Sequence, residues 1–95
     1  MNEFTRERIE DVAEGVTELC EGVAACVAEV LAIDPNTVFA GSTLLSLGAE
    51  SFDFVALVFA LERKYAIGLP SRYSTPNDQT VDDYVSAVRA RMKAI

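Results

Sequence analysis

The chain has 95 residues, of which 51% are apolar, and it carries a formal net charge of −7. This length suits a single domain with a modest core, and so high an apolar content excludes a disordered chain. The chain contains no histidine, which removes the usual general base, most metal sites, and the Ser-His-Asp and Cys-His pairings of nucleophilic enzymes.

The charge is distributed unevenly along the chain. Residues 1–62 contain two basic and twelve acidic residues, whereas residues 63–95 contain six basic and three acidic ones. The first part would repel phosphate backbones, so we expect no nucleic-acid partner, and its field favours partners with basic docking patches. Cys20 and Cys26 match no metal or redox spacing, and we expect reduced thiols in or near the core. No apolar run is long enough to span a bilayer and no signal peptide is evident, which predicts a cytoplasmic protein.

The first predicted element is an amphipathic helix from about Thr5 to Leu31. Its apolar residues recur at spacings of three and four, and a stripe of glutamates with the same spacing falls on the opposite face. Gly15 and Gly22 each weaken a helix by up to about 1 kcal/mol relative to alanine. The segment is therefore either one long helix or two helices hinged near a glycine. The apolar stripe consists of Ile9, Val12, Val16, Leu19, Val23, Val27 and Val30.

Asp34-Pro35-Asn36 is expected to end this helix, since proline and its neighbours favour a turn. A connection from Thr37 to Ala49 follows. It is long for a helical domain, and long loops in compact domains are often functional. Its leucines are available to hold it against the core: Leu44, Leu45 and Leu47.

A second helix is predicted over residues 51–65, and its apolar residues do not keep to one side. A chain this short cannot surround such a helix on all sides, so we expect one face to be exposed as a docking surface. The face expected to be buried contains Phe54, Leu57, Val58, Leu61 and Tyr65. The face expected to be exposed contains Phe52, Val55 and Phe59, with Ala56 and Arg63 beside them.

The remaining residues predict a short helical turn and one further helix. Gly68, Pro70 and residues 74–77 interrupt the helical pattern. Thr80 and Asp83 then fit a capping box, with Asp in place of the usual Glu or Gln. Three main helices, one short helix and no strand-like alternation predict an all-α bundle.

Ser51 lies between Glu50 and Asp53 where the second helix begins. Its residue type predicts an N-cap whose hydroxyl accepts a hydrogen bond from the amide of residue 53 or 54. The flanking acids are not needed for that role, and the following aromatic residues place apolar surface beside an exposed hydroxyl. Catalysis by Ser51 would need a positioned base and an oxyanion hole, and without histidine Glu50 and Asp53 are only weak bases. Ser51 is therefore either a simple cap or a cap that is also modified.

Residues from about Glu18 to Met92 resemble an acyl carrier protein. The order and spacing of four segments carry this resemblance, which covers about four-fifths of the chain. They are Val27-Ala-Glu-Val-Leu-Ala-Ile33 with Asp34-Pro-Asn-Thr-Val38, then Leu47-Gly-Ala-Glu-Ser-Phe-Asp53, then Val55-Ala-Leu-Val-Phe-Ala-Leu-Glu62, then Tyr65-Ala-Ile-Gly-Leu-Pro70. The resemblance implies a four-helix acyl-carrier-like bundle over residues 18–95, preceded by an N-terminal helical extension over residues 1–17.

The resemblance implies that Ser51 is the attachment point of a 4′-phosphopantetheine arm. A phosphopantetheinyl transferase would add this arm from coenzyme A, and its thiol would carry an acyl group as a thioester. The protein would catalyse nothing itself. As a cytoplasmic monomer it would serve acyl-loading, condensing or acyltransferase enzymes of fatty-acid, polyketide-like or lipid pathways. The docking residues implied are Glu50, Phe52, Asp53, Ala56, Phe59, Glu62 and Arg63.

Six positions in and just before the second helix depart from the pattern of the family. Glu50 stands where the family usually has Asp, Phe52 stands where Leu is usual, and Ala56 stands where an acid is common. Phe59 replaces a smaller flexible apolar residue, and Arg63 and Lys64 replace acids. Docking is therefore expected to depend more on aromatic burial and less on charge than in a housekeeping fatty-acid carrier. Two alternatives remain open: an aminoacyl or peptidyl carrier, which uses the same serine, and an unmodified carrier-fold interaction module.

Overall fold

The structure is a computed structural model that describes residues 18–93 of the chain. This part contains three α-helices and two short 3-10 helices, and within it no residue belongs to a β-strand. The predicted all-α fold is therefore confirmed. The predicted N-terminal extension over residues 1–17 lies outside the described residues. None of the described helices is long and apolar enough to cross a membrane.

The first helix covers residues 18–31 of the described part. Val23 and Val27 are fully buried on one side, whereas Glu18 and Glu21 are exposed on the other, as the two stripes predict. The helix is continuous at Gly22, so no hinge lies there. A Cβ atom at this position would collide with the Tyr65 hydroxyl, which packs against the helix at that point.

The chain leaves the first helix through a left-handed residue, Ala32, with a φ of 56°. Asp34 then caps a short 3-10 helix, η1 (Pro35–Thr37), by accepting a hydrogen bond of 2.9 Å from the Asn36 amide. The predicted end of the first helix is thus confirmed. Proline suits the first turn of η1 because its missing N–H has no partner there.

The connection that follows is held between the first helix and the last one. Leu44 is fully buried and Leu47 is half-buried, so both hold the loop as predicted, whereas Leu45 is exposed. Two backbone hydrogen bonds attach the loop to the start of the last helix: Val81 N–H to Ser42 O at 2.8 Å and Asp82 N–H to Ala40 O at 2.9 Å.

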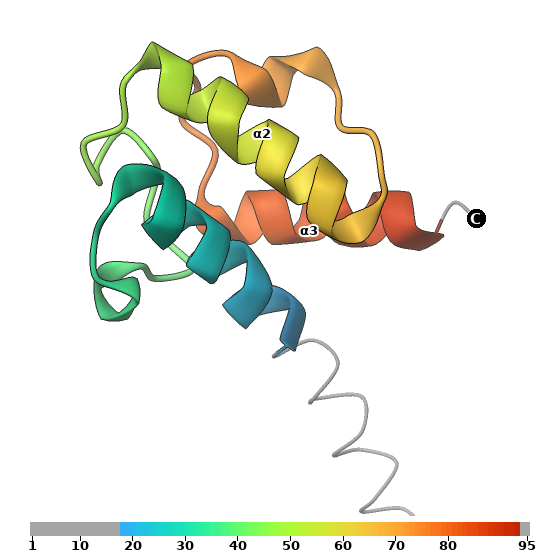
Figure 1. The fold of residues 1–95 in the computed structure, drawn as a ribbon, viewed down its shortest axis with the longest axis horizontal. Coiled ribbons are helices and arrows are strands. Elements are labelled where there is room, and N and C mark those ends of the chain that lie inside the picture. Colours follow the sequence, from blue (N-terminus) through green and yellow to red (C-terminus); the bar gives the residue numbers. More distant parts are fainter. Residues whose placement is uncertain (1–17, 94–95) are drawn as a thin grey trace, which may run out of the picture.

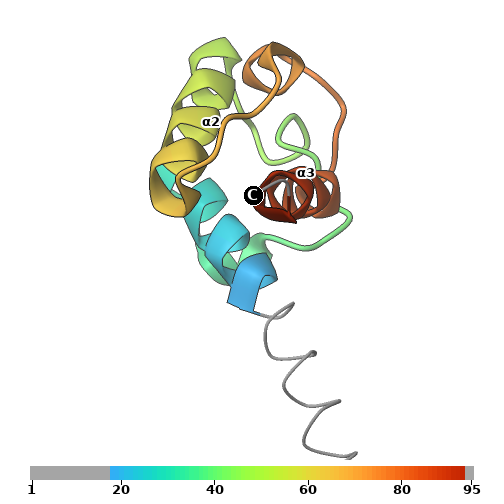
Figure 2. The same cartoon turned by 90° about the vertical axis from the view of Figure 1, so that its right-hand side faces the viewer.

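The central helix, α2 (Ser51–Tyr65), has the predicted bounds. Its predicted buried face is confirmed: Phe54, Leu57 and Leu61 are fully inaccessible and Val58 is nearly so, while Tyr65 at the end of the helix is half-buried against the core. Figure 1 shows α2 passing over the last helix, α3 (Val81–Lys93), with the first helix beside them. Figure 2 looks nearly along α3 and shows α2 and the first helix on one side of it.

The segment between α2 and α3 contains the short 3-10 helix η2 (Ser71–Ser74), where the sequence predicts a short helical turn. Tyr73 and Tyr84 bind η2 to α3. Their rings meet edge to face with centroids 5.2 Å apart, and the Tyr84 hydroxyl donates to the Tyr73 carbonyl at 2.9 Å. The predicted capping box of α3 is confirmed, because Thr80 N–H donates to Asp83 Oδ2 at 2.9 Å and Asp83 N–H donates to Thr80 Oγ1 at 3.1 Å.

Candidate functional site

Ser51 is the first residue of α2, and its side chain is exposed. The predicted N-cap role of Ser51 is wrong. Glu50, with an extended backbone (φ −103°, ψ 170°), occupies the N-cap position. Within residues 18–93, the contacts that cap the helix are made by Glu50 and Asp53 and do not use the Ser51 hydroxyl.

Asp53 supplies the cap in place of Ser51. Its carboxylate accepts a hydrogen bond of 2.8 Å from the Glu50 amide, while the Asp53 amide donates to the Glu50 carbonyl at 2.9 Å. Only 8% of the Asp53 surface is exposed. One acid beside the serine is thus needed for capping, contrary to the expectation from the sequence. An acid at this place also suits the positive end of the helix dipole.

The loop before Ser51 is fixed by its own hydrogen bonds. Thr43 and Ser46 share three hydrogen bonds. Thr43 N–H donates to Ser46 Oγ at 3.2 Å, Ser46 N–H donates to Thr43 Oγ1 at 3.0 Å, and the Ser46 hydroxyl donates to the Thr43 carbonyl at 2.8 Å. The Ala49 amide donates to the carbonyl of buried Leu44 at 2.9 Å. Gly48 has a φ of 92°, a left-handed conformation that L-residues adopt at a cost. These contacts place the serine on a fixed support.

The start of α2 offers an exposed hydroxyl beside the amide end of a helix. The chain has no histidine to act as a base for the hydroxyl. Within the described residues, no three His, Cys, Asp or Glu side chains lie together in a way that could hold a metal ion. The first amides of an α-helix lack intrahelical partners and carry a partial positive charge, which stabilises a phosphate group placed there. A phosphodiester on the Ser51 oxygen would lie at such a place.

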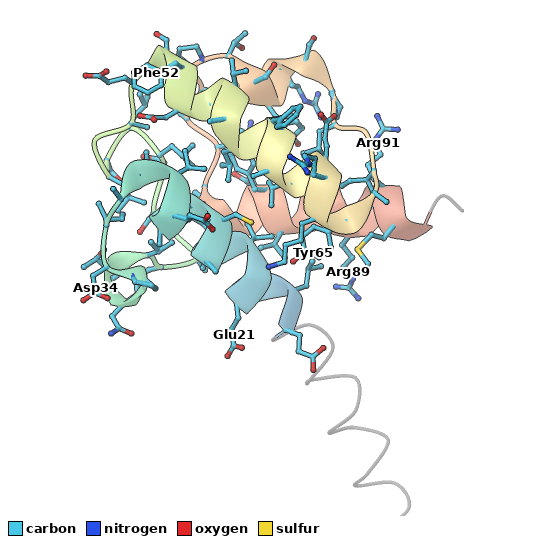
Figure 3. All side chains as sticks on the ribbon, viewed as in Figure 1. Glu21, Asp34, Phe52, Tyr65, Arg89 and Arg91 are labelled. Carbon is cyan, nitrogen blue, oxygen red and sulfur yellow. The ribbon has the colours of Figure 1, made fainter. Side chains whose placement is uncertain are left out.

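The structure brings most of the predicted docking residues to the outer side of α2. Phe52 and Phe59 are 66% and 59% exposed, and Ala56, Arg63 and Glu50 are also exposed. The predicted exposed face of α2 is therefore confirmed as exposed. Figure 3 shows Phe52 at the outer edge of the molecule, where α2 begins.

Two of the predicted docking residues make hydrogen bonds within the fold. Asp53 is buried in the cap, and Glu62 is half-buried with its carboxylate accepting a 2.8 Å hydrogen bond from the Leu69 amide. Conversely, Val55 is 56% exposed and lies between the two phenylalanines, although the docking set predicted from the sequence omits it. Its helical spacing from Phe52 and Phe59 is the signal that includes it.

Comparisons with known proteins agree with this geometry. A family described by its phosphopantetheine attachment site matches residues 21–80. The acyl carrier protein of Helicobacter hepaticus is 39% identical over 71 residues, which cover 74% of this chain and 92% of that protein. The chain belongs to the acyl carrier protein family. The acyl carrier protein of Thermosynechococcus vestitus is 30% identical over 79 residues, which cover 82% of this chain and 96% of that protein. No solved structure matches the chain significantly.

Membership of the acyl carrier protein family implies a covalently attached 4′-phosphopantetheine. The chemistry of the residues at the start of α2 suits such a group. The group needs an exposed hydroxyl for its phosphodiester, and the Ser51 hydroxyl is exposed. The cap formed by Glu50 and Asp53 does not use that hydroxyl.

Proposed function

We propose that the chain holds acyl groups on a 4′-phosphopantetheine arm joined to the Ser51 hydroxyl. It would deliver them, in the cytoplasm, to enzymes of fatty-acid, polyketide-like or lipid pathways. The arm supplies a terminal thiol on which an acyl group is carried as a thioester. Residues 18–95 form the carrier domain in this proposal, with η2 as the short helix of a four-helix bundle. The observation that carries the proposal is the exposed Ser51 hydroxyl on a helix that Asp53 caps.

The residues of the chain contribute position and electrostatics rather than chemistry. The loop contacts of Thr43, Ser46 and Leu44 hold the start of α2 in place. The amide end of α2 stabilises negative charge on the Ser51 oxygen and on a phosphate attached to it. No side chain nearby has to activate the serine, because a phosphopantetheinyl transferase would supply the base for the attachment.

Docking in this proposal uses α2, with the transferase and the acyl-loading, condensing or acyltransferase enzymes as partners of a monomeric carrier. The exposed positions Glu50, Phe52, Ala56, Phe59 and Arg63 support it, because they lie on the helix that begins at Ser51. Asp53 and Glu62 would contribute indirectly, through the cap and through the turn after α2.

The experiment is an intact-mass measurement after incubation with coenzyme A and a phosphopantetheinyl transferase. Wild-type protein should gain the mass of one arm, and Ser51→Ala protein should gain nothing. Ser86→Ala is a matched control, because it removes an exposed serine hydroxyl from another helix, α3, and should still be modified. A failure of the wild type with several transferases, one of them from the source genome, would support an unmodified interaction module instead. Loading assays with acyl and aminoacyl ligases would then identify the cargo.

A further inference from the structure

The outer side of α2 carries a row of large apolar side chains, which we call the α2 stripe: Phe52, Val55 and Phe59. They are 66%, 56% and 59% exposed. Their spacing of three and four residues places them along one line of the helix, and the row begins directly after Ser51. Three such side chains in one row form the kind of apolar patch that marks an interaction site.

The two carboxylates of α2 are engaged inside the fold rather than exposed beside this row. Asp53 is buried in the cap, and the half-buried Glu62 carboxylate accepts a hydrogen bond from the Leu69 amide. Apart from Glu50 at the start of the helix, the exposed charges of α2 are those of Arg63 and Lys64. The face is therefore cationic at its C-terminal end, although the whole chain has a net charge of −7.

Of these two cations, Arg63 lies at the end of the α2 stripe and Lys64 does not. The Arg63 guanidinium carbon lies 5.7 Å from the centroid of the Phe59 ring, a cation–π arrangement that holds it at the end of the row. Lys64 turns toward the first helix, with its Nζ 5.9 Å from the centroid of the Tyr65 ring and close to the backbone of Gly22. The row thus presents two aromatic rings, one valine and one guanidinium.

We infer that the partner enzyme whose apolar groove receives the α2 stripe places a carboxylate against Arg63. An amphipathic helix whose anchors are three and four residues apart fits a groove of this kind. A guanidinium pairs with a carboxylate through two parallel hydrogen bonds, and a nearby ring restricts its rotamers in advance. The inference rests on the proposed function, because docking beside Ser51 brings the cargo to the partner.

A second copy of the chain would be a poor occupant of this surface. The α2 stripe begins next to Ser51, so a copy seated on it would cover the hydroxyl that the transferase must reach. The net negative charge of the chain attracts basic surfaces from a distance. The α2 stripe and its ends, however, present the cation Arg63 and no exposed carboxylate other than Glu50. The Arg63 guanidinium at the end of the row would therefore pair best with a carboxylate of the partner.

The first step of the test is photo-crosslinking in the source organism, with p-benzoylphenylalanine in place of Phe59. Phe39 is a matched control position, because it is an aromatic residue outside α2 that is 67% exposed. An enzyme crosslinked from position 59 and not from position 39 is expected. Crosslinking to a second copy, confirmed by a dimer in analytical ultracentrifugation, would overturn the inference, as would the absence of any crosslinked protein at position 59.

The second step measures the affinity of that purified enzyme for the full chain by calorimetry. Phe59→Ala and Arg63→Glu should each weaken binding by at least about tenfold, as expected for an anchor and for a charge placed against a like charge. Phe39→Ala and Arg89→Glu should change it less than about twofold, since Arg89 lies on the side of α3 away from α2 (Figure 3). Replacing the partner carboxylate by lysine should restore binding of Arg63→Glu.

Unchanged or tighter binding of Arg63→Glu would overturn the inference. The mass gain of the Arg63→Glu protein with coenzyme A and transferase is measured in parallel. A wild-type protein that is never modified but still binds in an Arg63-dependent manner would refute the carrier function alone. A protein that is modified on Ser51 but binds independently of Arg63 would refute the docking chemistry alone.

Discussion

The hydroxyl of Ser51 and the carboxylate of Asp53 have separate roles at the start of α2. Asp53 satisfies the Glu50 amide and is buried there, so the helix has its cap without the serine. The serine is left exposed at the positive end of the helix. This division lets the side chain that carries a group change chemically without loss of the helix start.

The two residues should therefore differ in their effect on stability. Ser51→Ala should change the free energy of unfolding by less than about 0.5 kcal/mol, as for an ordinary surface position. Asp53→Ala should lower it by about 1 to 2 kcal/mol, because it removes a cap and leaves a shielded amide unpaired. Urea denaturation followed by circular dichroism measures both. If Ser51→Ala lowered the free energy of unfolding more than Asp53→Ala does, Ser51 and not Asp53 would supply the cap.

The two cysteines should differ in reactivity. Burial raises the pKa of the Cys26 thiol above its ordinary value of 9.0, and the nearby Lys64 charge only partly opposes this. Because the thiolate is the reactive form, Cys26 should react with iodoacetamide more slowly than half-buried Cys20 at neutral pH. Its rate should still be rising at pH values above 9.0, because the raised pKa keeps most of the thiol protonated at that pH. Peptide mass spectrometry measures both rates. The two cysteines should react at equal rates in urea, and equal rates in the folded protein would contradict the burial of Cys26.

At the scale of the helices, α2 has two apolar faces with different functions. Phe54 is fully buried, and Phe59 is 59% exposed on the other side of the same helix. The same change at both positions separates core packing from docking. Phe54→Ala should lower the free energy of unfolding by about 3 to 5 kcal/mol, whereas Phe59→Ala should lower it by less than about 1 kcal/mol. Denaturant titration of both variants checks this, and equal losses would place Phe59 in the core.

The positions of the helices follow largely from the sequence, because apolar periodicity and turn residues determine them locally. The bounds of α2, its two faces and the Thr80–Asp83 capping box are all predicted correctly. The cap of α2 is predicted wrongly. Ser51 and Glu50 are adjacent, and the residue type favours serine as the cap. The choice depends on where Asp53 points, which tertiary packing decides. The acid three residues after Glu50 is the local signal that identifies this cap.

The side chains of Glu62 and Leu45 show the same limit. The sequence places Glu62 beside the docking face, and only the fold brings the Leu69 amide to its carboxylate. Leu45 is as apolar as Leu44, but the turn from residue 44 to residue 48 directs Leu44 into the core and leaves Leu45 exposed. Apolar periodicity predicts neither the contacts between segments that are distant in sequence nor the direction in which a side chain points within an irregular loop.

At the scale of the whole molecule, the distribution of charge opposes folding. The chain has a net charge of −7, and no lysine or arginine occurs between residues 9 and 62. The glutamates of the first helix therefore repel one another and the other acids of this part. Salt should screen this repulsion, so the midpoint of thermal unfolding should rise by several degrees between about 10 mM and about 300 mM NaCl. Glu21→Gln should reduce that rise, and a midpoint that falls with salt would contradict this account.

The most direct test of the central claim is to locate the modification within the protein isolated from its source organism. Intact mass gives the number of arms per chain, and fragmentation of the peptide that contains residues 46–53 identifies the modified side chain. We predict one 4′-phosphopantetheine arm per modified chain, attached to the Ser51 oxygen. An arm on another residue, or a chain that carries none in cells with an active transferase, would contradict the account.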